Sequence, residues 1–225
     1  MSEAILRATG LRKEYGSTLA LRGADLTVRT GEVVAIMGPS GSGKSTLLHC
    51  LAGVITPDQG EVRLDGVPLA GLNDRARSRL RRSSFGFVFQ FGQLVPELPA
   101  IENIALPLLL AGSKRREAMS VARAWFPRLG LDGLEHRLPG QMSGGQSQRV
   151  AVARALAAGP RVVFADEPTG ALDSLAGEQV MDLLIDAART QGATVVLVTH
   201  EARVAAHADR TVIVRDGRVT APVEA

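Results

Sequence analysis

The chain has 225 residues, 45% hydrophobic and 22% charged, and its 26 basic and 23 acidic residues leave a net charge of +3. This length suits one large domain, or a domain with an inserted subdomain, that can bury a full hydrophobic core. The single cysteine, Cys50, excludes an internal disulfide, and no Cys/His cluster suggests structural zinc. No apolar stretch is long enough to cross a bilayer, so we expect a cytosolic protein that reaches a membrane through a partner.

The N-terminal part of the chain alternates short strands with one helix. Residues 5–11 and 24–28 alternate between apolar and polar side chains, which predicts strands of a half-buried antiparallel sheet. Residues 32–37 are a short apolar run that ends in a glycine-rich turn. Residues 45–52 then predict a helix that is closed by Gly53.

A second group of elements follows before the character of the chain changes. Residues 61–64 predict a strand, and the turn at Asp65-Gly66 indicates a hairpin. Residues 75–82 predict a short basic helix, and residues 85–89 a further strand. A basic run of this kind is typical of a solvated helix face, although it could also face anionic lipid or nucleic acid.

The stretch from residue 91 to about residue 160 is rich in Leu, Ala and Arg and has a helical pattern, which predicts a helical subdomain inserted into an α/β core. After it come an apolar strand at 161–165, a helix at 175–189, an apolar strand at 194–199 and a hairpin at 211–219. Apolar strands separated by helices predict a mostly parallel sheet covered on both faces. The expected breaks of the helical stretch are Pro96, Pro99, Gly112, Pro127 and Pro139-Gly140.

Residues 38–45 read Gly-Pro-Ser-Gly-Ser-Gly-Lys-Ser and fit the phosphate-loop pattern G-x-x-x-x-G-K-[ST] between a predicted strand and a predicted helix. Glycines allow backbone N–H groups to curl around phosphate oxygens, and the following helix adds its positive N-terminal end. Lys44 can bridge the β- and γ-phosphates, and the Ser45 hydroxyl can ligate magnesium. The loop therefore predicts binding and hydrolysis of ATP.

Two carboxylates, Asp166 and Glu167, end the apolar strand predicted at 161–165. Ligands bind at the carboxyl ends of parallel strands, so Asp166 is expected near the magnesium ion. Glu167 is expected to act on the attacking water as a general base or to position it. The alternative is that the pair caps the next helix, and the nearby phosphate loop makes this alternative the weaker one.

A second segment with open backbone groups is predicted at residues 142–149, Met-Ser-Gly-Gly-Gln-Ser-Gln-Arg, ahead of a helix. Ser143 is a good N-cap, and two glycines leave backbone N–H groups at the helix start for an anion. One chain needs only one nucleotide cradle, so a second is unexpected.

The Ser-Gly-Gly-Gln run, the phosphate loop and the Asp-Glu pair together resemble those of ATP-binding-cassette (ABC) ATPases. The resemblance implies a P-loop NTPase core with an antiparallel β subdomain, formed by residues 1–90 and 161–225, and a helical signature subdomain at about 91–160. It also implies a head-to-tail dimer in which the signature helix of one subunit closes over the γ-phosphate held by the other. The cofactors that it implies are ATP and Mg²⁺.

Four further residues fit the same family in order along the chain. Tyr15 matches the aromatic residue that stacks on adenine, and Gln90 matches the glutamine that senses magnesium and the coupling partner. Asp173 matches the loop that crosses the dimer interface, and His200 matches the histidine on the γ-phosphate. Alone, Tyr15 is more typical of a packed aromatic residue and His200 of a capping or surface histidine, and Gln90 alone indicates nothing. Ser147 departs from the pattern, since relatives often carry Gln or Glu there, and we expect catalysis to survive this.

The resemblance thus implies three sets of site residues. The catalytic set is Glu167, His200, Gln90 and Lys44, and the metal set is Ser45, Gln90 and Asp166. The nucleotide-binding set is Tyr15, Gly38, Pro39, Ser40, Gly41, Ser42, Gly43, Lys44, Ser45, Thr46, Ser143, Gly144, Gly145, Gln146 and Asp173.

The segment from residue 85 to 109 is similar to the group of lipoprotein-release, macrolide-export, bacitracin-resistance and haem-export ATPases. This implies a separate permease on the inner face of the cell membrane, whose coupling helix meets the groove near Gln90 to Leu98. Phe91, Leu94 and Val95 are apolar loop residues that fit such a contact; packing within the helical subdomain is the alternative. Export or extracytoplasmic mechanical work is the main prediction. A regulatory cassette that controls wall hydrolases remains open, and no nucleic-acid partner is expected.

Overall fold

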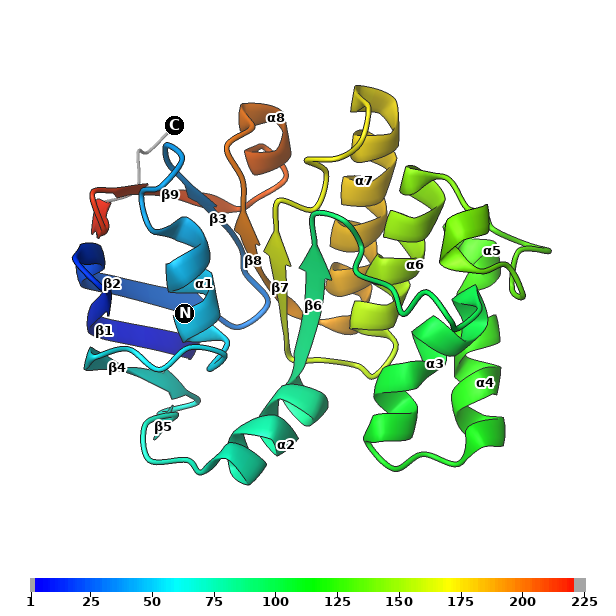
Figure 1. The fold of residues 1–225 in the computed structure, drawn as a ribbon, viewed down its shortest axis with the longest axis horizontal. Helices are drawn as coiled ribbons and strands as arrows, with labels where there is room; N and C mark the ends of the chain where they lie inside the picture. Colours follow the sequence, from blue (N-terminus) through cyan, green and yellow to red (C-terminus); the bar gives the residue numbers. More distant parts are fainter. Residues whose placement is uncertain (1–2, 221–225) are drawn as a thin grey trace. The chain divides into compact units, whose positions relative to one another are not determined.

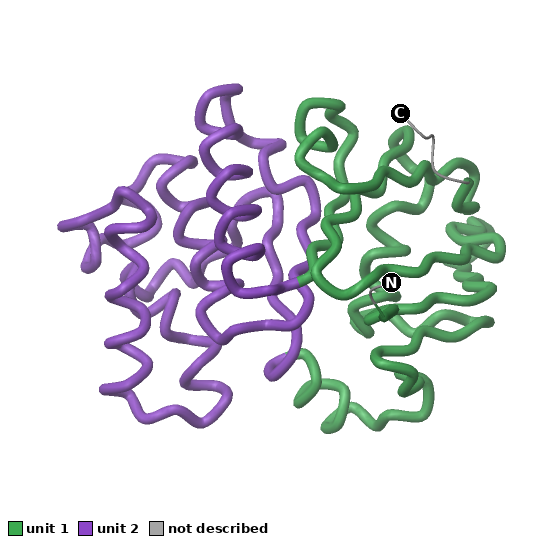
Figure 2. Tube along the Cα trace, turned by 180° about the vertical axis from the view of Figure 1, so that it is seen from behind, with its two compact units in different colours: residues 1–81, 194–225 green, residues 82–193 purple. Residues whose placement is uncertain are grey.

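The computed structural model describes residues 3–220 and divides into two compact units (Figure 2). The first unit consists of residues 1–81 and 194–225, and the second of residues 82–193. The second unit is therefore inserted between two sequence segments of the first. The sequence predicts a helical subdomain with boundaries near residues 90 and 160. These boundaries rest on the helical pattern of the sequence and stay a prediction.

The first unit contains a four-stranded antiparallel sheet in the order β2-β1-β4-β5 (Figure 1). Buried and exposed residues largely alternate along its two long strands, because one face of the sheet packs on the core. The turn at Asp65-Gly66 joins the last two strands, so the predicted hairpin is confirmed. The strands are β1 (Ala4–Tyr15), β2 (Thr18–Arg29), β4 (Gln59–Leu64) and β5 (Val67–Pro68).

A second set of strands in this unit is mostly parallel. Strand β3 (Val33–Met37) pairs in parallel with both β8 (Thr194–Val198) and β9 (Arg210–Arg215). Strand β10 (Arg218–Thr220) turns back antiparallel to β9, as the Asp216-Gly217 turn predicts. The core positions of β3 and β8 are apolar and fully buried, which is typical of strands covered on both faces.

Helix α1 (Lys44–Leu51) follows β3 and contacts both the antiparallel sheet and β8, so it lies between the two sets of strands. Its buried face includes Leu47, Leu48 and Leu51. A short helix, α8 (Ala202–Ala205), packs against β3 and was absent from the sequence prediction. Four residues are too few to show a hydrophobic period, which explains the omission.

The second unit has one parallel strand pair, β6 (Phe85–Phe89) with β7 (Val162–Asp166), and a group of helices. Helix α6 (Gly144–Leu156) is central, because it packs against α3, α5, α7 and β6. The other helices of this unit are α3 (Ala100–Leu110), α4 (Arg115–Arg123), α5 (Phe126–Leu129), the 3₁₀ turn η1 (Pro139–Gln141) and α7 (Ser174–Gln191). Helix α2 (Asp74–Ser84) contains the boundary between the units.

The predicted fold class is confirmed, with element ends that differ by a few residues. The break predicted at Pro127 falls earlier, at residues 124–125, and Pro127 itself lies in the first turn of α5. Proline is tolerated there because the first N–H groups of a helix have no intrahelical partner. Pro107 lies inside α3.

Candidate active site

The phosphate loop connects β3 to α1. Two of its positions need glycine, because backbone atoms of other segments lie where a side chain would begin. Gly38 has φ 148°, and a Cβ atom there would lie 2.1 Å from the carbonyl oxygen of Val214. Gly43 has φ 104°, and its Cβ atom would lie 2.4 Å from the carbonyl oxygen of Ala20. Only glycine fits both the positive φ and the missing space.

Lys44 is almost fully buried, at 8% exposed, and its side chain folds back over the loop. Its Nζ donates hydrogen bonds to the carbonyl oxygens of Gly38 (2.8 Å) and Pro39 (2.9 Å). The Ser42 hydroxyl is also buried and has no hydrogen-bond partner among the described residues. Buried polar atoms are rarely left unpaired, so this hydroxyl fits a loop that receives polar oxygens from a phosphate.

The turn between β9 and β10 supports the loop from behind. The N–H of Gly217 donates to the carbonyl oxygen of Ser42 at 3.0 Å, and Gly217 accepts a hydrogen bond from the N–H of Arg22 at 2.7 Å. The sequence predicted the hairpin but not this support. No local signal marks it, because the turn and the loop are far apart in sequence.

The start of α1 is suited to an anion. Its first turn contains no acidic side chain. Its N-cap is Gly43, so no capping side chain occupies the first N–H groups of the helix. Ser45 is exposed and Thr46 is half-buried on this first turn. The chemistry of these residues fits a nucleotide phosphate with a Mg²⁺ ion.

Two more predicted residues lie in the first unit. Tyr15 ends β1, is 46% exposed, and has Lys13 Nζ 5.6 Å from its ring centroid. The ring is therefore available for stacking. His200 is exposed and lies two residues after the end of β8. The turn there is held by a hydrogen bond from the N–H of Glu201 to Thr199 Oγ1 (3.0 Å).

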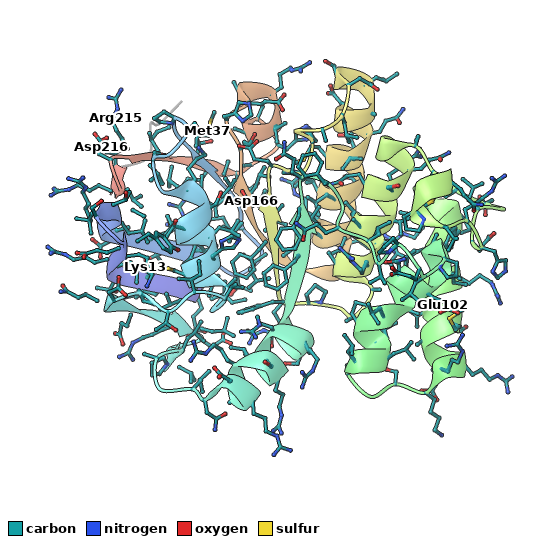
Figure 3. The ribbon with its side chains drawn as sticks, in the orientation of Figure 1. Lys13, Met37, Glu102, Asp166, Arg215 and Asp216 are labelled. Atoms are coloured by element: carbon teal, nitrogen blue, oxygen red, sulfur yellow. The ribbon has the colours of Figure 1, made fainter. Side chains whose placement is uncertain are left out.

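The acidic pair lies in the second unit, where Asp166 is the last residue of β7 (Figure 3). Glu167 has φ 49°, a left-handed conformation that is uncommon for a residue with a side chain. The turn after it is closed by a hydrogen bond from the N–H of Gly170 to the carbonyl oxygen of Glu167 (3.1 Å). Such strain is retained where the surrounding structure requires a particular side-chain direction.

Gln90 follows β6, the strand next to β7, and the structure brings it to the same turn. A Cβ atom added to Gly170 would lie 2.8 Å from Nε2 of Gln90. The Gln90 side chain thus packs directly on the turn that carries Glu167. Within this unit the predicted glutamine and the predicted carboxylates do converge.

The signature segment begins α6, and the prediction of Ser143 as its N-cap is confirmed. Ser143 Oγ accepts from the N–H of Gln146 (3.2 Å), and Gln146 Oε1 accepts from the N–H of Ser143 (2.9 Å). This reciprocal capping box occupies both side chains. Cβ atoms added to Gly144 and Gly145 would lie 3.5 Å from Leu172 and 3.3 Å from Ala176, so the glycines allow close packing on the start of α7.

Asp173 is the N-cap of α7, and its side chain accepts from the N–H of Ala176 at 2.9 Å. The predicted residues are therefore grouped by unit. The phosphate loop, Tyr15 and His200 belong to the first unit, while Gln90, the acidic pair, the signature segment and Asp173 belong to the second.

Comparison with known proteins decides the family. A family model described as ABC transporter matches residues 21–170, which include the phosphate loop, the signature segment and the acidic pair. The chain belongs to the ABC transporter family. This ABC cassette is 44% identical to the lipoprotein-releasing system ATP-binding protein LolD of Hyphomonas neptunium, with 100% of both chains covered. It is 47% identical to the protein of the same name in Cereibacter sphaeroides, over 97% of this chain and 100% of the relative.

A solved structure shares the fold of the cassette. The ATP-binding cassette MJ0796, solved as a dimer in a post-hydrolysis state with ADP and Pi, is 39% identical and has a TM-score of 0.89. The match covers 97% of this chain and 98% of the other. The chain is thus the ATP-binding subunit of an ABC transporter. It binds ATP with Mg²⁺ and hydrolyses ATP. Among residues 3–220, no helix is both long and apolar enough to span a membrane.

Proposed function

We propose that this cassette closes head to tail with a second copy around two ATP molecules and thereby drives a separate permease in lipoprotein release or export. The observation that carries the cargo class is the similarity over the full length to proteins named for lipoprotein release. A relative named for macrolide export is 45% identical over 97% of this chain, which spans 34% of that longer protein. We place the chain on the cytoplasmic, inner face of the cell membrane, bound through its permease.

The proposed roles follow the chemistry of each side chain. Lys44 and the loop N–H groups bind the β- and γ-phosphates, while Ser45, Gln90 and Asp166 hold the magnesium ion. Glu167 acts on the attacking water and His200 contacts the γ-phosphate. Tyr15 stacks on adenine, and Ser143 to Gln146 of the second copy, with its Asp173, complete the site.

The proposed permease contact is the loop from Gln90 to Leu98. Phe91 is 74% exposed although it is a large apolar residue, and Leu94 and Val95 are half-buried in the same loop. Packing inside the second unit therefore leaves Phe91 without an apolar environment. An exposed aromatic side chain at a loop tip fits an anchor for a partner helix.

The test is co-purification of the tagged chain with membrane proteins, for wild type, Phe91→Asp and Val67→Asp. Val67 is also exposed, at 59%, but lies in β5 of the other unit. We expect wild type and Val67→Asp to retain a permease encoded beside the chain, and Phe91→Asp to lose it while still binding ATP. Retention of the permease by Phe91→Asp would refute the contact.

The cargo class is tested with the reconstituted wild-type complex in vesicles. ATP-dependent release of a lipoprotein or efflux of a hydrophobic compound supports the proposal. ATP-dependent activation of a wall hydrolase, with neither release nor efflux, would support the regulatory alternative instead.

A further inference from the structure

Strand β1 ends at Tyr15, and one carboxylate holds the residues just before it. Asp58 Oδ1 accepts a hydrogen bond from Lys13 Nζ at 2.7 Å, and Asp58 Oδ2 accepts one from the N–H of Glu14 at 2.7 Å. The N–H of Asp58 donates to the carbonyl oxygen of Arg12 at 2.9 Å. The pairing of β1 with β2 is irregular between Lys13 and Glu14, so the strand ladder alone does not fix this end.

The lysine of this pair, which Figure 3 labels, also lies beside the aromatic ring. Lys13 Nζ is over the Tyr15 ring, 5.6 Å from its centroid, within the range of a cation–π contact. The hydrogen bond between Lys13 and Asp58 raises the pKa of the lysine and lowers the pKa of the carboxyl group, so both are charged at neutral pH. An ammonium group over one face of the ring leaves the opposite face as the one on which a base can stack.

The loop that carries Asp58 is fixed to the C-terminal end of α1. The N–H groups of Val54 and Ile55 both donate to the carbonyl oxygen of His49, at 2.9 and 3.2 Å. The same helix begins at Lys44 of the phosphate loop. The place of Asp58 is therefore set by the helix whose other end belongs to the phosphate site.

Two arginines of the basic helix α2 hold the same loop from its other side chains and carbonyl groups. Arg77 Nη1 donates to Thr56 Oγ1 at 2.6 Å, and Arg81 Nη1 donates to the carbonyl oxygen of Gly53 at 3.0 Å. Both arginines are half-buried. Part of the basic run that the sequence predicted as a solvated face thus binds residues 53–56.

We propose that Asp58 and Lys13 are positioning residues that set the Tyr15 ring at a fixed place relative to the phosphate loop, so that one nucleotide meets both sites without further ordering. This rests on the proposed stacking of adenine on Tyr15. The loop after α1 joins the two sites through Asp58. If the end of β1 were not held in this way, the base would have to order it on binding, and this would weaken the affinity for nucleotide.

The first test is a double-mutant cycle on the affinity for ADP with Mg²⁺, measured by titration calorimetry of the full chain. ADP contains the base but is not hydrolysed. We expect Asp58→Ala to raise the Kd about fivefold, because the aromatic contact loses its fixed position. In a Tyr15→Ala background the same substitution should change the Kd by less than about 1.5-fold, because no ring is left to position.

Glu61→Ala is the matched control. Glu61 forms a similar ion pair with Arg63, at 2.8 Å, on β4 of the same sheet, and we expect its loss to leave the Kd unchanged. An unchanged Kd in Asp58→Ala would overturn the proposal. An equal loss of affinity in the Tyr15→Ala background would also overturn it, because Asp58 would then not act through the ring.

The single variant Tyr15→Ala separates the two levels of the argument. Normal binding of ADP by this variant would refute the proposed stacking role, and the inference with it. Weakened binding by Tyr15→Ala together with normal binding by Asp58→Ala would refute only the inference. Failure of the proposed function and failure of this inference are therefore distinguishable.

Asp58→Asn guards against a variant that does not fold. Its amide oxygen can still accept from the N–H of Glu14, but it carries no charge for Lys13. We expect a Kd between that of wild type and that of Asp58→Ala, since charge-assisted hydrogen bonds are the stronger ones. A Kd equal to that of wild type would show that the ion pair is not needed.

The second test observes the ring itself and does not depend on nucleotide affinity. Tyr15 is the only tyrosine of the chain, so a sample labelled in its tyrosine ring reports on this one side chain by NMR. Lys13→Met keeps an unbranched side chain but removes the ammonium group, and we expect the ring signals of the free chain to move. Lys13→Arg should move them less, because a guanidinium group can also lie over the ring and bind Asp58. Ring signals that stay at their wild-type positions in Lys13→Met would overturn the role assigned to Lys13.

Discussion

At the scale of single residues, the phosphate loop is shaped before any phosphate enters it. Lys44 is buried against the carbonyl oxygens of Gly38 and Pro39, and the Ser42 hydroxyl is buried without a partner among the described residues. A lysine held by neutral carbonyl oxygens gains a stronger, ionic partner when phosphate arrives. The residue identities were predictable from the motif, whereas the buried, unpaired state of Ser42 was not.

We expect Lys44→Ala to weaken ATP binding at least about a hundredfold, because the variant loses a charge-assisted contact to two phosphates. Isothermal titration of the purified chain with ATP and Mg²⁺ measures this. Lys114→Ala is the control, since Lys114 is an exposed lysine in the other unit. Equal affinity of Lys44→Ala and wild type would contradict the assigned role.

Cys50 is buried on α1, and burial raises the pKa of its thiol from 9.0 to about 11. The raised pKa keeps the thiol neutral up to high pH, and the thiolate is the reactive form. At pH 8 we expect alkylation of the folded chain to be at least about a hundredfold slower than in denaturant. Mass spectrometry after timed iodoacetamide treatment measures both rates. Similar rates would show that the thiol is accessible in the folded protein.

At the scale of elements, each motif depends on a partner element that its own sequence does not reveal. The phosphate loop rests on the β9–β10 turn through Gly217, and its Gly43 lies against β2. In the other unit, α6 begins with a reciprocal capping box formed by Ser143 and Gln146. The sequence predicted Ser143 as the N-cap, but it predicted Gln146 only as a nucleotide-binding residue. The capping box depends on side-chain geometry that local propensity does not determine.

The two inner glycines of the loop make a matched pair. Gly43→Ala places Cβ 2.4 Å from the carbonyl oxygen of Ala20, whereas Gly41→Ala (φ 74°) meets nothing within 4 Å. We expect Gly41→Ala to lower the free energy of unfolding by about 1 kcal/mol from backbone strain alone. Gly43→Ala adds a backbone clash and should cost about 3 kcal/mol or more. Urea denaturation followed by circular dichroism measures both; equal costs would mean that β2 can move away from the loop.

At the scale of the whole molecule, the proposed active form is a dimer. One chain carries a single phosphate loop and a single signature segment, and the related cassette MJ0796 was solved as a dimer with ADP and Pi. In the proposed head-to-tail closure, binding of ATP by two chains stabilises an assembly that neither chain forms alone.

We expect Glu167→Gln to bind ATP, to hydrolyse it at least about a thousandfold more slowly, and to accumulate as an ATP-bound dimer. The amide keeps the shape of the side chain but cannot accept the proton of the attacking water. Light scattering with ATP and Mg²⁺, beside a phosphate-release assay, tests both parts. A Glu167→Gln chain that turned over like wild type would refute the general-base role. A chain that stayed monomeric with bound ATP would refute dimer closure.

The sequence by itself determined the α/β class, the two hairpins and the order of the motifs from Tyr15 to His200. These are local signals: glycine spacing, apolar runs and turn pairs are set by neighbouring residues. Only the tertiary structure decided what holds the motifs in place. Gln148 reaches a carbonyl group 59 residues away at Phe89, and Gly217 supports Ser42 across most of the chain. Such bonds join buried side chains or turn amides to backbone carbonyls, a group that every residue carries, so they leave no pattern in the sequence.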